Sequence, residues 1–422
     1  MKRYLSGIDW IMSSLDYAGR KACGIGNISQ IVLKLEEPLE ENYIRERIKL
    51  LEKAPLIHGY SSRGLNLCPY WKMNLKDSSV TLNTFSTQDN LSIDELLRVF
   101  GDHMNKPFRN KREHLVFNLV KNNKESFLGM IFDHRLLDAR GAETLLSILG
   151  SSLKFSFQNE LSAPAQLNSW YDKFSSGRKV NRFFMSLNKG ETYSSPYPKI
   201  NHKIGLRLVT YDKLETTKIA ENSFKQAGYL MFMPYLLAKS IIILHRVFEK
   251  RNISCSDYLI PVSIDKRGQG ATDGKVFFNH LSFLFFRIKP EEIMDQDKLL
   301  LIIKEQLYKQ VKEGLPEAFL QASLLIRIVP LYLINLFTRF ISKSKASSFS
   351  FSFVVDNSNN LESFLGKKIL NVFHLPRLPY PPGIGIFFNQ SQGKLNTTLS
   401  YLEGLLSDDD INQITEDLKS LI

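Results

Sequence analysis

Residues 132–141 read Phe-Asp-His-Arg-Leu-Leu-Asp-Ala-Arg-Gly and bring a histidine and an aspartate within four positions of each other. The imidazole of His134, with an ordinary pKa of about 6.5, can take a proton from a hydroxyl or an amine at neutral pH. Such a base supports acyl transfer from a thioester, a reaction that needs neither a metal nor a covalent protein intermediate. Asp138 has two open roles, because it could orient the imidazole or brace the loop by pairing with an arginine.

A histidine near an aspartate is a weak indication by itself, since the chain has eight histidines and 43 acidic residues. Residues 131–146, however, resemble the HHxxxDG segment of a large superfamily of acyltransferases. That superfamily includes chloramphenicol acetyltransferase, peptide-synthetase condensation domains, plant acyltransferases and bacterial wax ester synthase/diacylglycerol acyltransferases. The resemblance implies that His134 is the catalytic base and that Asp138 forms a structural salt bridge with an arginine elsewhere in the chain.

Two positions depart from that motif. Asp133 stands where the first histidine is usual, and Ala139 stands where the glycine is usual. The first histidine is a supporting residue, so we expect Asp133 to change how the loop is held rather than to abolish activity. Ala139 adds only a methyl group, which fits if its φ is negative. We expect Gly141 to supply part of the lost freedom.

The resemblance extends over nearly the whole chain and is nearest to the wax ester synthase branch. On this match Arg267 is the partner of Asp138; the alternative is an ordinary loop arginine beside two glycines. The matching segments are Leu-Ser-Gly-Ile-Asp-Trp at 5–10, Ile-Pro-Val-Ser-Ile-Asp-Lys-Arg at 260–267, Phe-Asn-His-Leu-Ser at 278–282, and the closing hairpin at 381–386 and 393–401.

Three further residues are candidates for lining a substrate tunnel: Asn279, Ser352 and Asn357. Asn279 could donate a hydrogen bond in the cleft or satisfy a strand end, and the structural role is the more ordinary one. No exact motif supports the other two. Phosphate-binding glycine loops and a Gly-x-Ser-x-Gly nucleophile elbow are absent, which disfavours nucleotide binding and serine hydrolysis.

The elements around His134 follow from the hydrophobic periodicity. The β-prone runs 114–120 and 126–132 are joined by a loop of hairpin length, and helical spacing begins after Gly141. His134 and Asp138 therefore lie in the connection from a strand to a helix. Further strands are predicted at 29–36, 205–210, 258–264, 281–288 and 350–355, and further helices at 40–53, 92–104, 228–249 and after Ser407.

Strands and helices alternate on both sides of a stretch that is poor in periodicity and holds several prolines. We therefore predict an α/β protein with two halves, 1–165 and 190–422, joined by a crossover at 166–189. The resemblance implies that each half is a chloramphenicol-acetyltransferase-like α/β sandwich. It also implies that the halves form a pseudo-dimer with an active-site tunnel between them.

The composition, with 43% hydrophobic and 23% charged residues, is that of an ordinary globular protein. The three cysteines are far apart and lack ligand spacing, so neither a disulfide framework nor a metal site is predicted. The net charge of +12 fits an acidic partner such as a phosphorylated cofactor, an acyl carrier protein or an anionic membrane. Basic residues gather at 178–207 without a nucleic-acid-binding signature, so we expect no nucleic-acid partner.

Acidic residues interrupt the apolar stretch that a signal peptide would need near the N-terminus, which favours a cytoplasmic location. The apolar stretches 228–247 and 322–341 contain charged residues whose cost at the centre of a bilayer argues against spanning helices. The second stretch, followed by Lys343 and Lys345, could instead lie on the inner membrane surface, although a role in the core is the more ordinary one.

The sequence thus predicts an acyltransferase with no bound cofactor. Acyl-CoA or an acyl carrier protein is the expected acyl donor, and a hydroxyl of a small or lipophilic molecule is the expected acceptor. One alternative is an amide-forming condensation enzyme that uses carrier-bound substrates. The other is a catalytically inactive binding or scaffold homologue, for which Asp133 and Ala139 argue.

Overall fold

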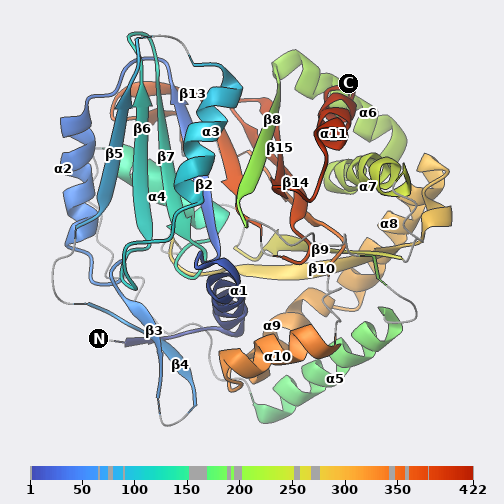
Figure 1. Ribbon diagram of the computed structural model, residues 1–422. Helices are drawn as coiled ribbons and strands as arrows, with labels where there is room; N and C mark the ends of the chain where they lie inside the picture. Colours follow the sequence, from blue (N-terminus) through green and yellow to red (C-terminus); the bar gives the residue numbers. More distant parts are fainter. Residues whose placement is uncertain are drawn as a thin grey trace.

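The computed structural model divides into two α/β lobes side by side, each built on a six-stranded sheet (Figure 1). The described residues are 2–64, 67–74, 79–88, 91–151, 169–187, 192–193, 202–250, 257–267, 276–341 (338–341 as backbone), 347–356, 361–378 and 380–421.

The sheet of the first lobe has the strand order β12-β13-β2-β7-β6-β5. All neighbours are antiparallel except β5 and β6. Two of its six strands come from the C-terminal part of the chain, so the first lobe is completed by residues far along the sequence. The bounds are β12 (Ser363–Phe364), β13 (Lys367–Pro376), β2 (Ile28–Leu35), β7 (Ser126–Asp133), β6 (Leu115–Lys121) and β5 (Thr81–Ser86).

The sheet of the second lobe has the order β10-β9-β11-β14-β15-β8. The hairpin between β14 and β15 turns at Gln392 and Gly393, whose φ angles of 54° and 75° suit the tight turn expected of a hairpin with a glycine at its tip. The bounds are β10 (Leu281–Ile288), β9 (Tyr258–Asp265), β11 (Ser350–Val354), β14 (Ile384–Ser391), β15 (Lys394–Leu402) and β8 (Ile204–Tyr211). A smaller sheet joins β1 (Lys2–Tyr4), β4 (Pro69–Lys72) and β3 (Tyr60–Arg63).

Amphipathic helices cover the sheets. Helices α2 and α4 bury their leucines and isoleucines against one face of the first sheet, while α3 packs on its other face. The helix bounds are α1 (Gly7–Cys23), α2 (Glu41–Glu52), α3 (Ile93–Met104), α4 (Ala139–Gly150), α5 (Trp170–Leu187), α6 (Lys213–Ala227), α7 (Phe232–Lys250), α8 (Gln296–Lys312), α9 (Leu315–Ile326), α10 (Leu331–Ile341) and α11 (Asp408–Lys419), with a 3₁₀ turn at Pro290–Glu292.

Several helix ends carry the expected caps. Ser92 and Glu95 form a capping box at the start of α3, and Ser407 caps α11. The range 166–189, expected as a crossover, contains α5, which packs along α9. The hydrophobic periodicity of this stretch is low because most side chains of α5 are exposed, so the sequence did not indicate a helix here.

The two lobes are joined by side chains of β15 that hydrogen-bond to the free edge of β13. The side-chain NH₂ of Asn396 donates to the carbonyl of Val372 at 2.9 Å. The hydroxyls of Thr398 and Ser400 donate to the carbonyls of His374 and Pro376 at 2.8 Å each. These alternate residues of β15 satisfy an edge that would otherwise carry unpaired buried carbonyls.

Within the described residues no single helix is both long and apolar enough to cross a membrane. Helices α6 and α7 together reach that length and composition, but they meet at a bend of 92°.

Candidate active site

His134 directly follows Asp133, the last residue of β7. Its backbone N–H donates to the carbonyl of Asn27 at 3.0 Å, which fixes the turn out of the strand. Its ring packs edge-on against Phe132, with the ring centres 5.3 Å apart. The ring nitrogen Nε2 lies 3.0 Å from the hydroxyl oxygen of Ser29 on β2. His134 therefore already makes a hydrogen bond between its Nε2 and a hydroxyl group.

Burial lowers the pKa of His134 below its ordinary value, while the nearby carboxylates of Asp138 and Asp133 oppose that shift. The imidazole is therefore neutral at pH 7, as a general base must be. Its other nitrogen, Nδ1, is buried and has no hydrogen-bond partner among the described residues.

Asp138 braces the loop instead of orienting the imidazole. Its Oδ1 lies 2.9 Å from Nη2 of Arg267 and accepts the backbone N–H of Gly141 at 2.8 Å, which caps α4. Its Oδ2 accepts the backbone N–H of His280 at 2.9 Å. No hydrogen bond joins Asp138 to His134, so of the two roles left open by the sequence the structure favours the bracing one.

Arg267 follows β9 of the second lobe and is almost fully buried against Asp138. Burial opposes its charge, but Asp138 and Asp265 together raise its pKa above the ordinary value. The pair expected from the sequence is therefore present, and it ties the second lobe to the first turn of α4.

Asn279 supports the backbone of the motif. Its side-chain NH₂ donates to the carbonyl of His134 at 2.8 Å. Its backbone N–H donates to Oδ1 of Asp9 at 3.0 Å, and Asp9 also closes the capping box of α1 with Ser6. The N-terminal Leu-Ser-Gly-Ile-Asp segment thus acts on the site through Asn279, a connection that the sequence did not indicate.

Asp133, at the position of the usual first histidine, is fully buried in a network of charged groups. Its carboxylate pairs with Arg135 at 2.6 Å and with Nδ1 of His114 at 2.9 Å. Burial disfavours its ionised form, but Arg135 and His114 hold its pKa far below the ordinary value. Asp133 therefore forms a structural ion pair with Arg135, and the imidazole next to it is that of His114, which directly precedes β6.

The other motif positions fit α4. Ala139 is its first residue and keeps an ordinary backbone, since it is not among the residues with positive φ. Glycine is needed at position 141 for a different reason from the expected backbone freedom. It too has an ordinary φ, but a Cβ there would lie 2.0 Å from the carbonyl oxygen of Val276. Gly141 therefore allows a close approach of the chain and does not supply backbone freedom.

No family model matches the chain, and no curated protein matches it in sequence. Solved structures do match its fold over the full length of the chain. A trichothecene 15-O-acetyltransferase, TRI3 from Fusarium sporotrichioides, has a TM-score of 0.71 at 11% identity and is covered over 94% of its chain. The fold is the two-lobed condensation-domain fold.

Two condensation domains show the same likeness. The first condensation domain of the CDA synthetase has a TM-score of 0.68 at 11% identity, with 95% of it covered. The starter condensation domain of rhizomide synthetase, solved with C8-CoA and Leu-SNAC, has a TM-score of 0.66 at 9% identity, with 92% covered. The predicted α/β pseudo-dimer is confirmed. The domain limits 1–165 and 190–422 stay a prediction, and β12 and β13 cross them to join the first sheet.

Of the other two tunnel candidates, the structure describes only Ser352. Ser352 lies half-buried on β11 of the condensation-domain fold, and no hydrogen bond joins it to the group around His134. Asn357 lies outside the described residues. Within the part of the chain that is described, no group of three or more His, Cys, Asp or Glu is placed to hold a metal ion.

A second buried ionic group lies near His134 and was missed by the sequence. Nε2 of His374 on β13 is 2.9 Å from Oε1 of Glu143 on α4, and the other oxygen of Glu143 pairs with Arg140 at 2.9 Å. His374 faces Ile31 across the sheet, so it shares a sheet face with Ser29. Only the pairing of β2 with β13 brings these residues together, and no local sequence signal marks them.

The lobes are closely packed at their junction in this condensation-domain fold. A cavity of about 30 Å³ lies there, bordered by α1, Asn27, Arg377 and Leu402. That volume holds about one water molecule.

Proposed function

We propose that this protein is an acyltransferase in which His134 is the general base. The observation that carries the proposal is the geometry of His134, a neutral imidazole whose Nε2 lies 3.0 Å from a hydroxyl oxygen, at the strand end of a condensation-domain fold. The acyl donor is a thioester, of CoA or of a carrier protein. The acceptor is a hydroxyl of a lipophilic molecule, as in the wax ester synthase branch that the sequence resembles.

The chemistry follows from that geometry. The acceptor hydroxyl takes the place that the Ser29 hydroxyl now has beside Nε2. As its oxygen attacks the thioester carbonyl, Nε2 takes the proton, because a base within hydrogen-bond reach can do so in the transition state. The C–S bond of the tetrahedral intermediate then breaks, and the imidazolium returns the proton to the leaving thiolate.

Asp138, Arg267 and Asn279 act as positioning residues in this proposal. They hold the backbone at the carbonyl of His134 and at the start of α4. A ring held in this way keeps its nitrogen aimed at one point, which is what proximity catalysis requires.

The test is product analysis by mass spectrometry after incubation with a long-chain acyl-CoA and a panel of alcohols and amines. His134→Ala should lose roughly 10²–10⁴-fold in turnover, the usual contribution of a general base. His103→Ala is the matched control, since that histidine is half-buried on α3 of the first lobe. A folded His134→Ala variant with undiminished turnover would refute the mechanism, and exclusive amide products would replace the hydroxyl acceptor with an amine.

A further inference from the structure

Helix α10 presents an apolar face to solvent. Tyr332, Leu333, Leu336 and Phe337 are between 39% and 65% exposed, and their spacing puts them on one side of the helix. The opposite side packs on α1 and buries Asn335. The inner side also packs apolar residues, Leu331 and Ile334, against the core, so α10 is apolar on both sides, whereas the outer side of an ordinary surface helix is polar.

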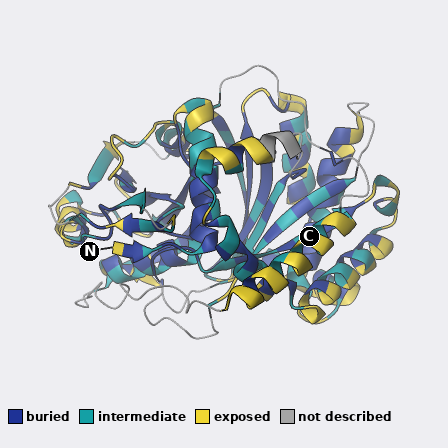
Figure 2. Cartoon of the chain, turned by 90° about the horizontal axis from the view of Figure 1, so that it is seen from below, coloured by how far each residue is buried: buried dark blue, intermediate teal, exposed yellow. Residues whose placement is uncertain are grey.

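Helix α5 adds aromatic residues on the same side of the molecule. Trp170, Tyr171 and Phe174, at its start, are between 55% and 73% exposed. Both helices lie along the lower side of the molecule in Figure 1, and Figure 2 views that side directly, with exposed residues in yellow. We call these seven residues of α5 and α10 the lower apolar face.

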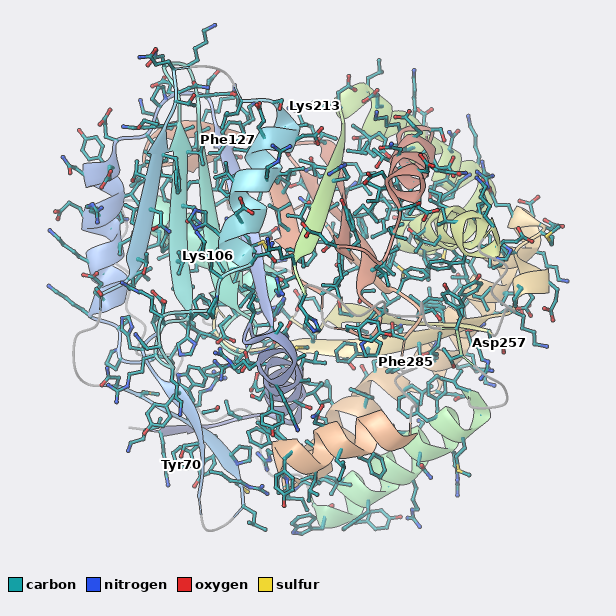
Figure 3. All side chains as sticks on the ribbon, viewed as in Figure 1. Tyr70, Lys106, Phe127, Lys213, Asp257 and Phe285 are labelled. Atoms are coloured by element: carbon teal, nitrogen blue, oxygen red, sulfur yellow. The ribbon has the colours of Figure 1, made fainter. Side chains whose placement is uncertain are left out.

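The outward aromatic residues are not needed to hold α5 in place. Its inner side is anchored by Phe184, whose ring meets that of Phe285 on β10 at 4.9 Å; Phe285 is labelled in Figure 3. Phe285 in turn contacts Phe319 of α9. The outward aromatic residues of α5 therefore lie outside the hydrophobic core.

Basic side chains accompany this face. Arg178 and Arg182 of α5 are exposed, and neither makes an ion pair or hydrogen bond with any described residue. Helix α5 carries four basic residues and one acidic residue, Asp172, and the whole chain has a net charge of +12. Aromatic residues beside unpaired arginines match the interface of an anionic bilayer, where rings lie at the headgroup level and cations gain from the surface potential.

We propose that the lower apolar face docks on an anionic lipid bilayer. A second copy of this chain fits less well, because like charges on two +12 molecules repel. An acidic protein would match the arginines but not the apolar stripe of α10. The docking does not depend on chemistry at His134. Combined with the proposed function, it would place the enzyme at the source of a lipophilic acceptor.

The test is flotation with vesicles of phosphatidylcholine alone and of phosphatidylcholine with one quarter phosphatidylglycerol. The wild-type protein should float with the anionic vesicles and bind less as salt is raised. The double variant Leu336→Asp/Phe337→Asp should lower the affinity for vesicles by roughly tenfold or more, because two apolar side chains no longer enter the interface. Arg178→Glu/Arg182→Glu should lose binding to anionic vesicles in particular.

Leu230→Asp is the matched control, since Leu230 is 77% exposed at the turn between α6 and α7, helices that lie above α5 and α10 in Figure 1. All variants should keep the wild-type melting temperature, because the changed side chains are exposed. The proposal is overturned if the wild type does not float or if the control loses as much binding as the α10 variant. It is also overturned if light scattering shows that the wild type is a dimer and the α10 variant is a monomer. None of these outcomes bears on turnover with soluble substrates, so the proposed function is tested separately.

Discussion

At the scale of single residues, the proposed chemistry depends on how burial and charge act on His134. Desolvation keeps its imidazole neutral, and the carboxylates around it moderate that effect without touching the ring. Asp138 and Asp133, which flank it, are both engaged with arginines. The two acidic residues of the motif therefore hold the loop in place, and in the proposed mechanism His134 acts without a carboxylate partner.

The pH dependence of turnover should report the lowered pKa of His134. Because the neutral form is active, kcat/KM should fall only as pH drops below about 6.5, with the midpoint of the acidic limb below that value. Protonating the buried ring also costs folding free energy, so the stability it contributes is present above that pH and lost below it. An acidic limb with its midpoint above 6.5 would contradict this assignment, and NMR titration of the imidazole gives an independent value.

The ion pair between Asp138 and Arg267 should matter more for stability than for binding. Removing one partner leaves a buried charge without compensation, so Arg267→Ala should lower the free energy of unfolding by about 3–5 kcal/mol. Asp138→Asn should cost less, because asparagine still caps a helix. Thermal or denaturant unfolding measures both. Lys49→Ala, which removes an exposed pair with Glu46, is the control and should change stability little; unchanged unfolding of the Arg267 variant would rule out a structural role for the pair.

At the scale of elements, the start of α4 is where strand, helix and the second lobe meet. The segment 276–280 lies against the motif loop, with the N–H of Phe278 donating to the carbonyl of Leu136 at 2.6 Å. This close approach is what excludes a side chain at position 141.

Gly141→Ala should therefore destabilise the protein, by roughly 1–3 kcal/mol, since the added methyl meets a backbone oxygen that cannot move freely. Gly101→Ala in α3 is the matched control. A Cβ there meets its nearest neighbour, Leu206, at 3.7 Å, so alanine should be neutral or stabilising through its higher helix propensity. Melting curves of the two variants decide the matter, and equal stability would show that the 276–280 segment shifts to accept the methyl group.

At the scale of the whole molecule, the two lobes meet along the edge of β13. β13 is reached late in the chain but completes the first sheet, while its outer edge is satisfied by β15 of the second lobe. The lobes should consequently unfold together, even though each has its own sheet.

Thr398→Val tests this junction. The change keeps the shape of the side chain but leaves the buried carbonyl of His374 without its donor, at a cost of about 1–3 kcal/mol. Thr217→Val, at an exposed threonine that bonds within α6, should cost little. Calorimetry should show a single transition at a lower temperature for Thr398→Val, whereas two separated transitions would mean that the lobes are independent.

The sequence by itself determined the local frame of this protein. Periodicity predicted β7, the turn at His134 and the helix after it, and capping chemistry predicted the start of α3, because these features depend on residues at most four positions apart. The pairing of Asp138 with Arg267, 129 positions away, was reached only through resemblance to a known motif.

Tertiary structure alone decided which groups meet His134. Ser29 and His374 reach its surroundings through the pairing of β2 with β7 and β13, and His114 reaches Asp133 from another strand end. Strand order is set by packing across the whole molecule, and the sequence of one strand does not show which strands pair with it. The lower apolar face likewise becomes visible only once the fold shows which side of α5 and α10 is left uncovered.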